Sequence, residues 1–163
     1  SEMCIRDRSY TYRVNGRSIE GIGYMNSYMP NYNYTHDQAA AVGMKNYDES
    51  IASFKKVVEL KPDLFEGNYY LGVFYTIKGD ALNKEMNEKQ YSSQAVYDAD
   101  LKVVNDVYKD AVPWFEKAHQ IKPDDVDTLE FLKSICFRLR DEAGIMEKYN
   151  TYNALYKQVK GIE

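Results

Sequence analysis

The chain has 163 residues, of which 44% are hydrophobic and 28% are charged, a composition typical of one globular domain with a real core. Its formal net charge of −4 argues against general nucleic-acid binding, which needs a basic face. No apolar run reaches the roughly 18 residues of a membrane span, so we expect no membrane-spanning segment.

Residues 1–33 show no helical periodicity and are expected to precede the folded domain. The run Met3-Cys4-Ile5-Arg6-Asp7 resembles the translation of a sequencing-library adapter. We therefore interpret residues 1–8 as a non-native leader on a chain truncated at its N-terminus, with a short native leader as the alternative. Glycines and a proline interrupt residues 9–33, which predicts a loose segment there. Because a truncated chain could have lost a signal peptide, the sequence predicts no cellular compartment.

Two helices are expected in the next segment, residues 34–64. An alanine-rich run favours helix over residues 35–45. Asn46 is a good N-cap for a second helix over residues 46–60, which Pro62 ends because proline cannot continue a helix. The apolar face of the second helix is formed by Ile51, Phe54 and Val58.

The longest helices are expected around residues 81–107. Apolar residues between positions 101 and 118 recur alternately at steps of three and four, which is the pattern of a heptad seam. We therefore expect one lengthened helix to end near Lys89 and another to restart between Gln94 and Asp98, so that the pair projects as an arm. The seam consists of Leu101, Val104, Tyr108, Ala111, Phe115 and Ala118.

The last part of the chain, residues 125–163, is expected to hold two more helices. Asp124 or Asp125 would cap the first of them, and residues 142–160 would form the second. Because the outer face of the final helix is polar, we expect it to close the array.

The stretch 46–80 resembles a tetratricopeptide repeat, a pair of helices of about 34 residues. The L-G-x2-Y pattern of the first helix is matched by Leu71, Gly72 and Tyr75, with Asn68 where the pattern prefers Trp. The A-x3-F…P pattern of the second helix is matched twice. The matching residues are Ser50, Phe54, Val57 and Pro62, and again Ala111, Phe115, Ala118 and Pro123.

This resemblance implies an all-α fold, a short α–α superhelix (solenoid) of about three helical hairpins, with the middle hairpin lengthened into the projecting arm. The two prolines that end the second helices lie about 27 residues further apart than one repeat of about 34 allows. We therefore treat residues 81–107 as a helical insertion. The domain would span residues 34–163, divided into repeat 1 (34–64), repeat 2 with the insertion (65–124), and repeat 3 with its capping helix (125–163).

In tetratricopeptide arrays, first-helix residues that do not face the core line a concave groove, which takes a peptide or a partner helix. The resemblance implies such a groove here, and Tyr69, Tyr70 and Phe137 are its strongest candidate anchors because aromatic residues are favoured at interfaces. The alternative is that these aromatic residues pack against the neighbouring repeat or against the final helix. The full predicted groove set is Tyr69, Tyr70, Val73, Ile77, Leu129, Lys133 and Phe137.

The sequence contains no catalytic constellation, glycine-rich phosphate loop or metal-spaced ligand pair, so we expect no enzyme activity, cofactor or metal. Cys4 and Cys136 form no pattern, and Cys136 lies on an apolar helix face, which favours an inert buried thiol. His36 and His119 each lack a second ligand at helix or turn spacing.

These patterns favour a non-catalytic protein-interaction or scaffolding module that binds a peptide or a partner helix. Self-association through the arm at residues 81–107 is a second way to engage a protein. One alternative is a helical accessory region of a larger enzyme or transport assembly, truncated at its N-terminus. Another is carbohydrate contact through a surface rich in tyrosine, of which the chain has 16.

Overall fold

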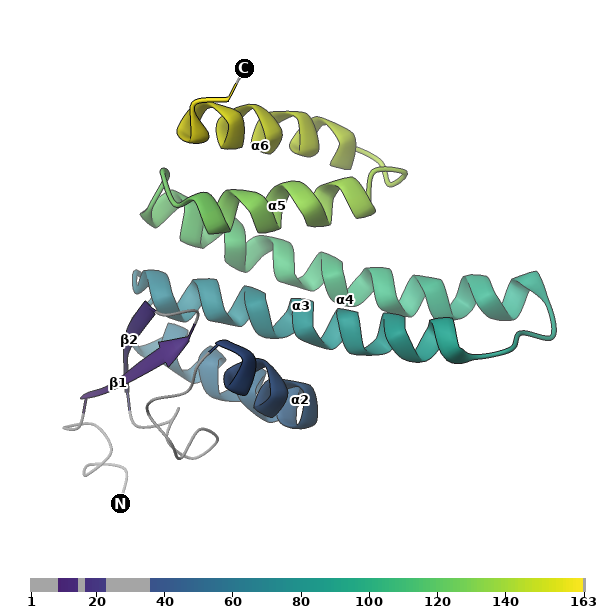
Figure 1. Cartoon of the computed structure of the whole chain (residues 1–163), viewed down its shortest axis with the longest axis horizontal. Coiled ribbons are helices and arrows are strands. Elements are labelled where there is room, and N and C mark those ends of the chain that lie inside the picture. The colour runs from purple at the N-terminus through teal and green to yellow at the C-terminus, as the bar shows by residue number, and fades with distance from the viewer. Residues whose placement is uncertain (1–8, 15–16, 23–35, 163) are drawn as a thin grey trace.

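The computed structural model describes residues 9–14, 17–22 and 36–162, and helices that each pack against the next make up its body (Figure 1). Side chains are described for residues 47, 48 and 50–162. The helical fold class predicted from the sequence is confirmed for residues 36–162. The helices are α2 (His36–Leu60), α3 (Phe65–Glu88), α4 (Gln94–Ile121), α5 (Val126–Arg138) and α6 (Ile145–Lys160).

A two-stranded antiparallel sheet precedes the helices. Strand β1 (Ser9–Val14) pairs along its whole length with β2 (Arg17–Ile22). The expectation of a loose segment was wrong for these two stretches. The overlooked signal is Asn15-Gly16, the dipeptide that most strongly favours a two-residue hairpin connection. The interpretation of residues 1–8 as a non-native leader falls outside the described residues.

Helix α2 is continuous from His36 to Leu60, although two helices were predicted with a break at Asn46. The physical reason is that asparagine, unlike proline, can remain inside a helix. An N-cap residue costs only a few tenths of a kcal/mol inside a helix, whereas breaking the helix would lose a turn of hydrogen bonds. The first of the three expected hairpins is therefore not formed.

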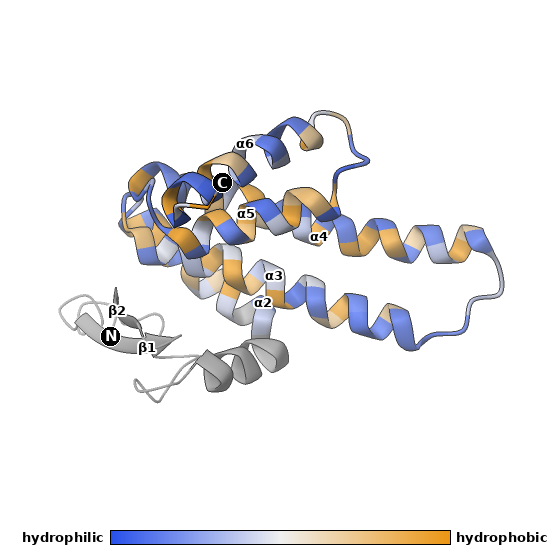
Figure 2. Cartoon of the chain, turned by 45° about the horizontal axis from the view of Figure 1, so that its top comes forward, coloured by the Kyte–Doolittle hydropathy of each residue, from blue (hydrophilic) through white to orange (hydrophobic). Residues whose placement is uncertain are grey.

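Helices α3 and α4 lie side by side and extend beyond the helices above and below them (Figures 1 and 2). Helix α3 ends at Glu88 and α4 begins at Gln94, in agreement with the ends expected from the sequence. Ser93 caps α4, with its hydroxyl accepting a hydrogen bond from the backbone N–H of Val96. None of the described helices is long and apolar enough to cross a membrane.

The predicted seam of α4 is buried in the core of the protein. Its central members Val104, Tyr108 and Phe115 are at most 4% exposed. Because this face is covered by the protein's own helices, it offers no surface for pairing with the arm of a second copy. The burial of the seam counts against pairing through that face, and self-association through the arm at residues 81–107 stays a prediction.

Aromatic side chains join the helices into one continuous core. The ring of Phe54 on α2 lies 5.2 Å from that of Phe74 on α3, measured between centroids. Further along the molecule, Phe115 on α4 stacks on Phe131 of α5 at 4.7 Å. This chain of contacts fixes α3 and α5 relative to each other, and so positions the site described below.

Helices α5 and α6 form the C-terminal layer. The Asp125 carboxylate caps α5, accepting hydrogen bonds from the backbone N–H and the hydroxyl of Thr128. Helix α6 begins at Ile145, later than expected, after Gly144, whose φ of 77° lies in the left-handed region that favours glycine. None of the residues of α6 is fully buried, so it packs on α5 through half-buried side chains.

Candidate functional site

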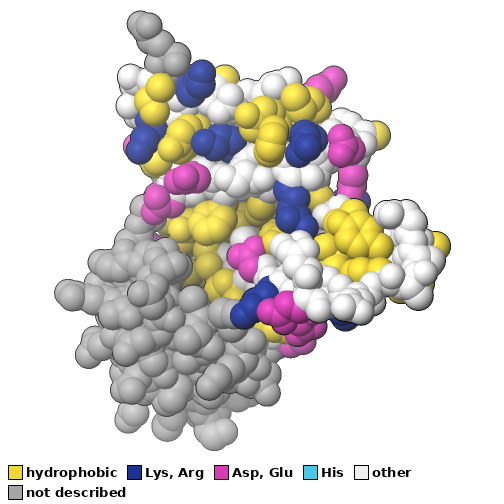
Figure 3. All heavy atoms as spheres, turned by 45° about the vertical axis from the view of Figure 1, so that its right-hand side comes forward, with side chains coloured by type: hydrophobic (Ala, Val, Ile, Leu, Met, Phe, Trp, Pro, Cys, Tyr) yellow, Lys and Arg dark blue, Asp and Glu magenta, His cyan; other side chains and the backbone are white. Residues whose placement is uncertain are grey.

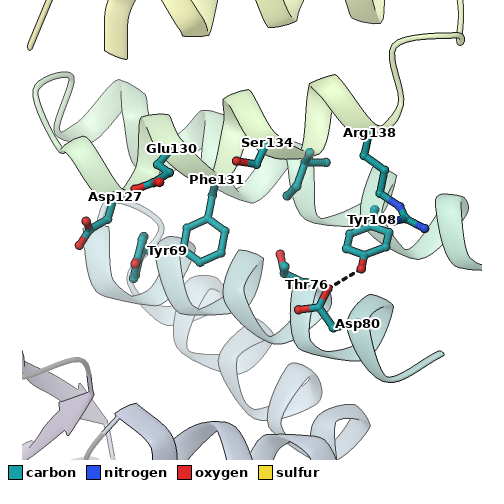
Figure 4. A pocket seen from close by; sticks show the side chains of 10 residues that line it. Tyr69, Thr76, Asp80, Tyr108, Asp127, Glu130, Phe131, Ser134 and Arg138 are labelled. Carbon is teal, nitrogen blue, oxygen red and sulfur yellow. Dashed lines mark hydrogen bonds between the residues drawn. The ribbon is translucent and has the colours of Figure 1, made fainter. Parts of the chain in front are cut away.

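A pocket of about 630 Å³ opens between α3, α4 and α5 (Figure 4). In the space-filling view, hydrophobic side chains are visible beneath the upper layer of the molecule, with acidic side chains near them (Figure 3). We call this pocket the α3–α5 groove. It is lined by Tyr69, Thr76 and Asp80 of α3, Tyr108 of α4, and Asp127, Glu130, Phe131, Ser134, Ile135 and Arg138 of α5.

The helix period places these residues on two facing surfaces. On α3 the spacings of seven and four residues bring Tyr69, Thr76 and Asp80 to one side of the helix. On α5 the spacings from Asp127 to Ser134 and then to Arg138 repeat this pattern. The two helix faces therefore supply a matched pair of walls, with Tyr108 of α4 at one end (Figure 4).

Most of the groove residues predicted on α3 lie in the core. Tyr70 is 2% exposed and Val73 is 4% exposed, so neither can contact a partner in this conformation. Tyr69 is only 1% exposed, yet its ring lines the α3–α5 groove. Ile77 is half-buried and packs against the core.

On α5, the residues that line the groove lie one position further along the chain than the predicted ones. Leu129 is buried, whereas its neighbour Glu130 lines the groove. Lys133 and Phe137 instead face α6, where the Lys133 Nζ lies 3.8 Å from the centroid of the Tyr156 ring. Phe137 packs against Tyr149 of α6, with ring centroids 5.3 Å apart.

A polar signal in the sequence marks the correct face of α5. The α5 residues that line the groove form a mostly polar stripe at helical spacing. The sequence-based prediction chose aromatic residues as anchors and therefore selected a different face. The stripe runs through Asp127, Glu130, Ser134 and Arg138.

One end of the groove holds a set of interacting polar groups, in which only the buried Nε of Arg138 lacks a hydrogen-bond partner among the described residues. The Tyr108 hydroxyl donates a hydrogen bond to the Asp80 carboxylate. The Arg138 guanidinium lies 4.4 Å from the centroid of the Tyr108 ring and donates to the Asn83 side-chain oxygen at 2.8 Å. Burial, together with the Asp80 carboxylate, raises the pKa of Tyr108 well above its usual range. The hydroxyl therefore remains a donor at neutral pH.

The other end of the groove combines two carboxylates with two aromatic rings. Asp127 and Glu130 flank Tyr69 and Phe131 in the close view (Figure 4). The Tyr69 and Phe131 rings meet edge to face at 6.0 Å between centroids. Because Phe131 also stacks on Phe115, this aromatic wall is anchored in the core.

The charges of the groove are unbalanced. Three carboxylates, those of Asp80, Asp127 and Glu130, face a single guanidinium, that of Arg138. No ion pair or hydrogen bond joins the Glu130 side chain to another residue of the described chain. The groove is therefore acidic, and its acidity is concentrated beside the aromatic wall.

No group of three His, Cys, Asp or Glu side chains in the described part of the chain could hold a metal ion. Cys136 is fully buried, as expected, and burial raises the pKa of its thiol to about 11. His119 lies edge to face against Tyr152 of α6, at 6.0 Å between centroids, and does not line the groove.

Comparison with known proteins identifies no relative of this chain. No family model, curated protein or solved structure matches it. The tetratricopeptide resemblance accordingly rests on residue patterns and helix positions within this chain alone. The α3–α5 groove is therefore the feature from which we infer a function.

Proposed function

We propose that this protein is a non-catalytic interaction module, built like a short tetratricopeptide array, that binds a segment of a partner protein in the α3–α5 groove. The observation that carries the proposal is the position of the groove. In tetratricopeptide arrays the first helices of successive pairs line the concave face, and α3 and α5 are the helices that carry the first-helix positions here. A pocket between these two helices is therefore the surface expected for binding.

The helix order supports the repeat interpretation. Pro62 follows α2 and Pro123 follows α4, so both helices that match the second-helix pattern end just before a proline. In this interpretation α2 corresponds to the second helix of the first repeat. Helices α3 and α4 form the lengthened second repeat, and α5 and α6 form the third.

The size and lining of the groove suit a short peptide segment. A volume of about 630 Å³ falls within the range of ligand pockets, roughly 300–1,000 Å³. The groove also has the half-buried ring of Phe131 for anchoring and several polar side chains for hydrogen bonding. A tyrosine-rich carbohydrate surface is less well supported, because Tyr69 and Tyr108 are both buried against neighbouring rings or helices.

The proposal is tested by selecting short random displayed peptides on the full 163-residue chain. Ser134 is exposed and lines the groove, so Ser134→Trp should fill the groove without disturbing the core. Asn150→Trp adds the same bulk at an exposed position on α6 and serves as the matched control. We expect peptides to be enriched on the wild-type protein, lost on Ser134→Trp and retained on Asn150→Trp. Failure of any peptide to be enriched, or equal binding to Ser134→Trp, would overturn the proposal.

A further inference from the structure

We infer that the α3–α5 groove selects protein segments that carry a lysine or arginine side chain, whose cation lies beside Glu130 and against the ring of Phe131. This inference rests on the proposed function and names the chemistry of the segment that the groove accepts. It follows from the charge of the groove, from its aromatic wall, and from a contact that the protein already makes elsewhere.

Charge complementarity identifies the occupant as a cation. The only guanidinium that lines the groove belongs to Arg138, and it already contacts Asn83 and the Tyr108 ring. The carboxylates of Glu130 and Asp127 lie toward the opposite end in the close view (Figure 4). A basic side chain entering at that end would meet the Glu130 carboxylate, which pairs with no other residue of the described chain, whereas an acidic segment would be repelled.

The aromatic wall provides a surface for the rest of a basic side chain. Lysine and arginine bury their aliphatic stems along apolar surface while the charged group stays near polar atoms. The cation itself is attracted to the face of an aromatic ring within about 6 Å. Phe131 supplies such a ring next to Glu130, and its stacking on Phe115 holds it in place before any ligand arrives.

The protein itself contains this arrangement, with the cation in place, on α3. Phe65 and Glu66 are adjacent there, and on α5 Glu130 and Phe131 are adjacent in the reverse order. The Nζ of Lys122 lies 4.4 Å from the centroid of the Phe65 ring and 3.7 Å from a carboxylate oxygen of Glu66.

On α5 the equivalent pair has no such cation. No lysine or arginine of the described chain contacts the Phe131 ring or pairs with Glu130. The carboxylate and ring on α5 therefore form a cation-receiving pair that a ligand would complete.

The test repeats the peptide selection on variants that change one charge. Glu130 is exposed, so Glu130→Lys should fold like the wild type. Glu88→Lys changes the net charge equally at an exposed residue of α3 near the tip of the arm, and is the matched control. We expect a preference for lysine or arginine at one peptide position on wild type and on Glu88→Lys. On Glu130→Lys, that position should favour aspartate or glutamate.

A binding measurement gives the size of the effect. A synthetic peptide from the selection is compared with its counterpart in which norleucine replaces the basic residue, and we expect about tenfold weaker binding of the norleucine peptide. Added salt should narrow this difference, because it screens the charge contact.

The outcomes separate this inference from the proposed function. Peptides that Ser134→Trp abolishes but that show no basic preference would leave the groove as the binding site and overturn the cation inference. A basic preference that disappears equally on Glu88→Lys would reflect overall charge and would also overturn it. Absence of any groove-dependent peptide would overturn both proposals.

Discussion

The ring of Phe115 on α4 lies directly against Gly72 on α3. A Cβ atom at position 72 would come within 2.8 Å of the Phe115 ring, closer than real Cβ contacts allow. The same relation recurs near the groove, where a Cβ at Gly79 would lie 2.9 Å from the ring of Tyr108. Two glycines therefore set the close approach of α3 and α4, and the ring of Tyr108 reaches the groove because of it.

Substitution of Gly72 by alanine should destabilise the protein although alanine favours helix. The gain in helix propensity is about 1 kcal/mol, whereas forcing a methyl group into this contact costs about 1–3 kcal/mol. We expect the free energy of unfolding of Gly72→Ala to fall by about 1 kcal/mol, measured by urea denaturation.

The Phe115→Leu background is the control for this prediction. A smaller side chain at position 115 leaves room for the alanine methyl group, so Gly72→Ala should be neutral or stabilising there. An equal loss in both backgrounds would show that the contact with Phe115 does not set the cost.

The hydroxyl of Tyr108 should make stability depend on pH in the alkaline range. The pKa of Tyr108 is raised in the folded protein, so its contribution to stability is fully present below its unfolded pKa of about 10. Above that pH the unfolded chain loses a proton that the folded protein keeps, and the free energy of unfolding decreases. We expect urea denaturation of Tyr108→Phe to show a shallower decrease between about pH 9 and pH 11 than the wild type shows.

At neutral pH, the free energy of unfolding of Tyr108→Phe reports only the loss of the hydrogen bond to Asp80. Loss of the bond to Asp80 should lower the free energy of unfolding by about 1 kcal/mol. Identical pH profiles for Tyr108→Phe and the wild type would contradict the assignment of the alkaline effect to this group.

Tyr70 and Phe137 were both predicted to be groove anchors, and the structure separates them. Tyr70 is 2% exposed and packs against Phe54 and Tyr69, whereas Phe137 is 48% exposed. We expect Tyr70→Ala to cost about 3–5 kcal/mol because it leaves a cavity. Phe137→Ala should cost much less because the ring is half in solvent. Thermal unfolding followed by circular dichroism measures both, and equal losses would contradict the assigned burial.

The parts of the fold that the sequence predicts well are those with strong local signals. Pro62, Pro123 and Ser93 mark helix ends, and the alternating steps of the α4 seam identify its buried face. The continuity of α2 was missed because a good N-cap at Asn46 does not by itself end a helix. Local sequence signals therefore predict a helix end where a proline follows. They do not predict whether a helix breaks where no proline is present.

Which face of α5 lines the groove is decided by tertiary contacts, and no local sequence pattern encodes these contacts. Helix α5 packs against α4 on one side and α6 on another, so apolar and aromatic residues occur on most of its circumference. Phe137 looks like an anchor in sequence because it is aromatic, yet it contacts Tyr149 of α6. Ser134 and Arg138 line the groove one position further on.

Cys136 should react slowly with alkylating reagents while the protein is folded. The thiolate is the reactive form, and burial raises the pKa of this thiol to about 11, compared with about 8.5 for a free cysteine. At about pH 8 this shift alone should slow the reaction at least about a hundredfold relative to the unfolded chain. The measurement is iodoacetamide labelling followed by mass spectrometry, on a Cys4→Ser chain so that Cys136 is the remaining thiol.

The dependence of this labelling on pH distinguishes a shifted pKa from opening of the C-terminal layer. Helix α6 has no fully buried residue, so its release from α5 is the least costly way to uncover Cys136. If the closed state reacts, the labelling rate should still rise between about pH 9 and pH 10, where a free thiol has already levelled off. A rate that levels off near pH 9 would show instead that α6 opens and that the released thiol has an ordinary pKa. A rate equal to that in urea would contradict the burial of Cys136.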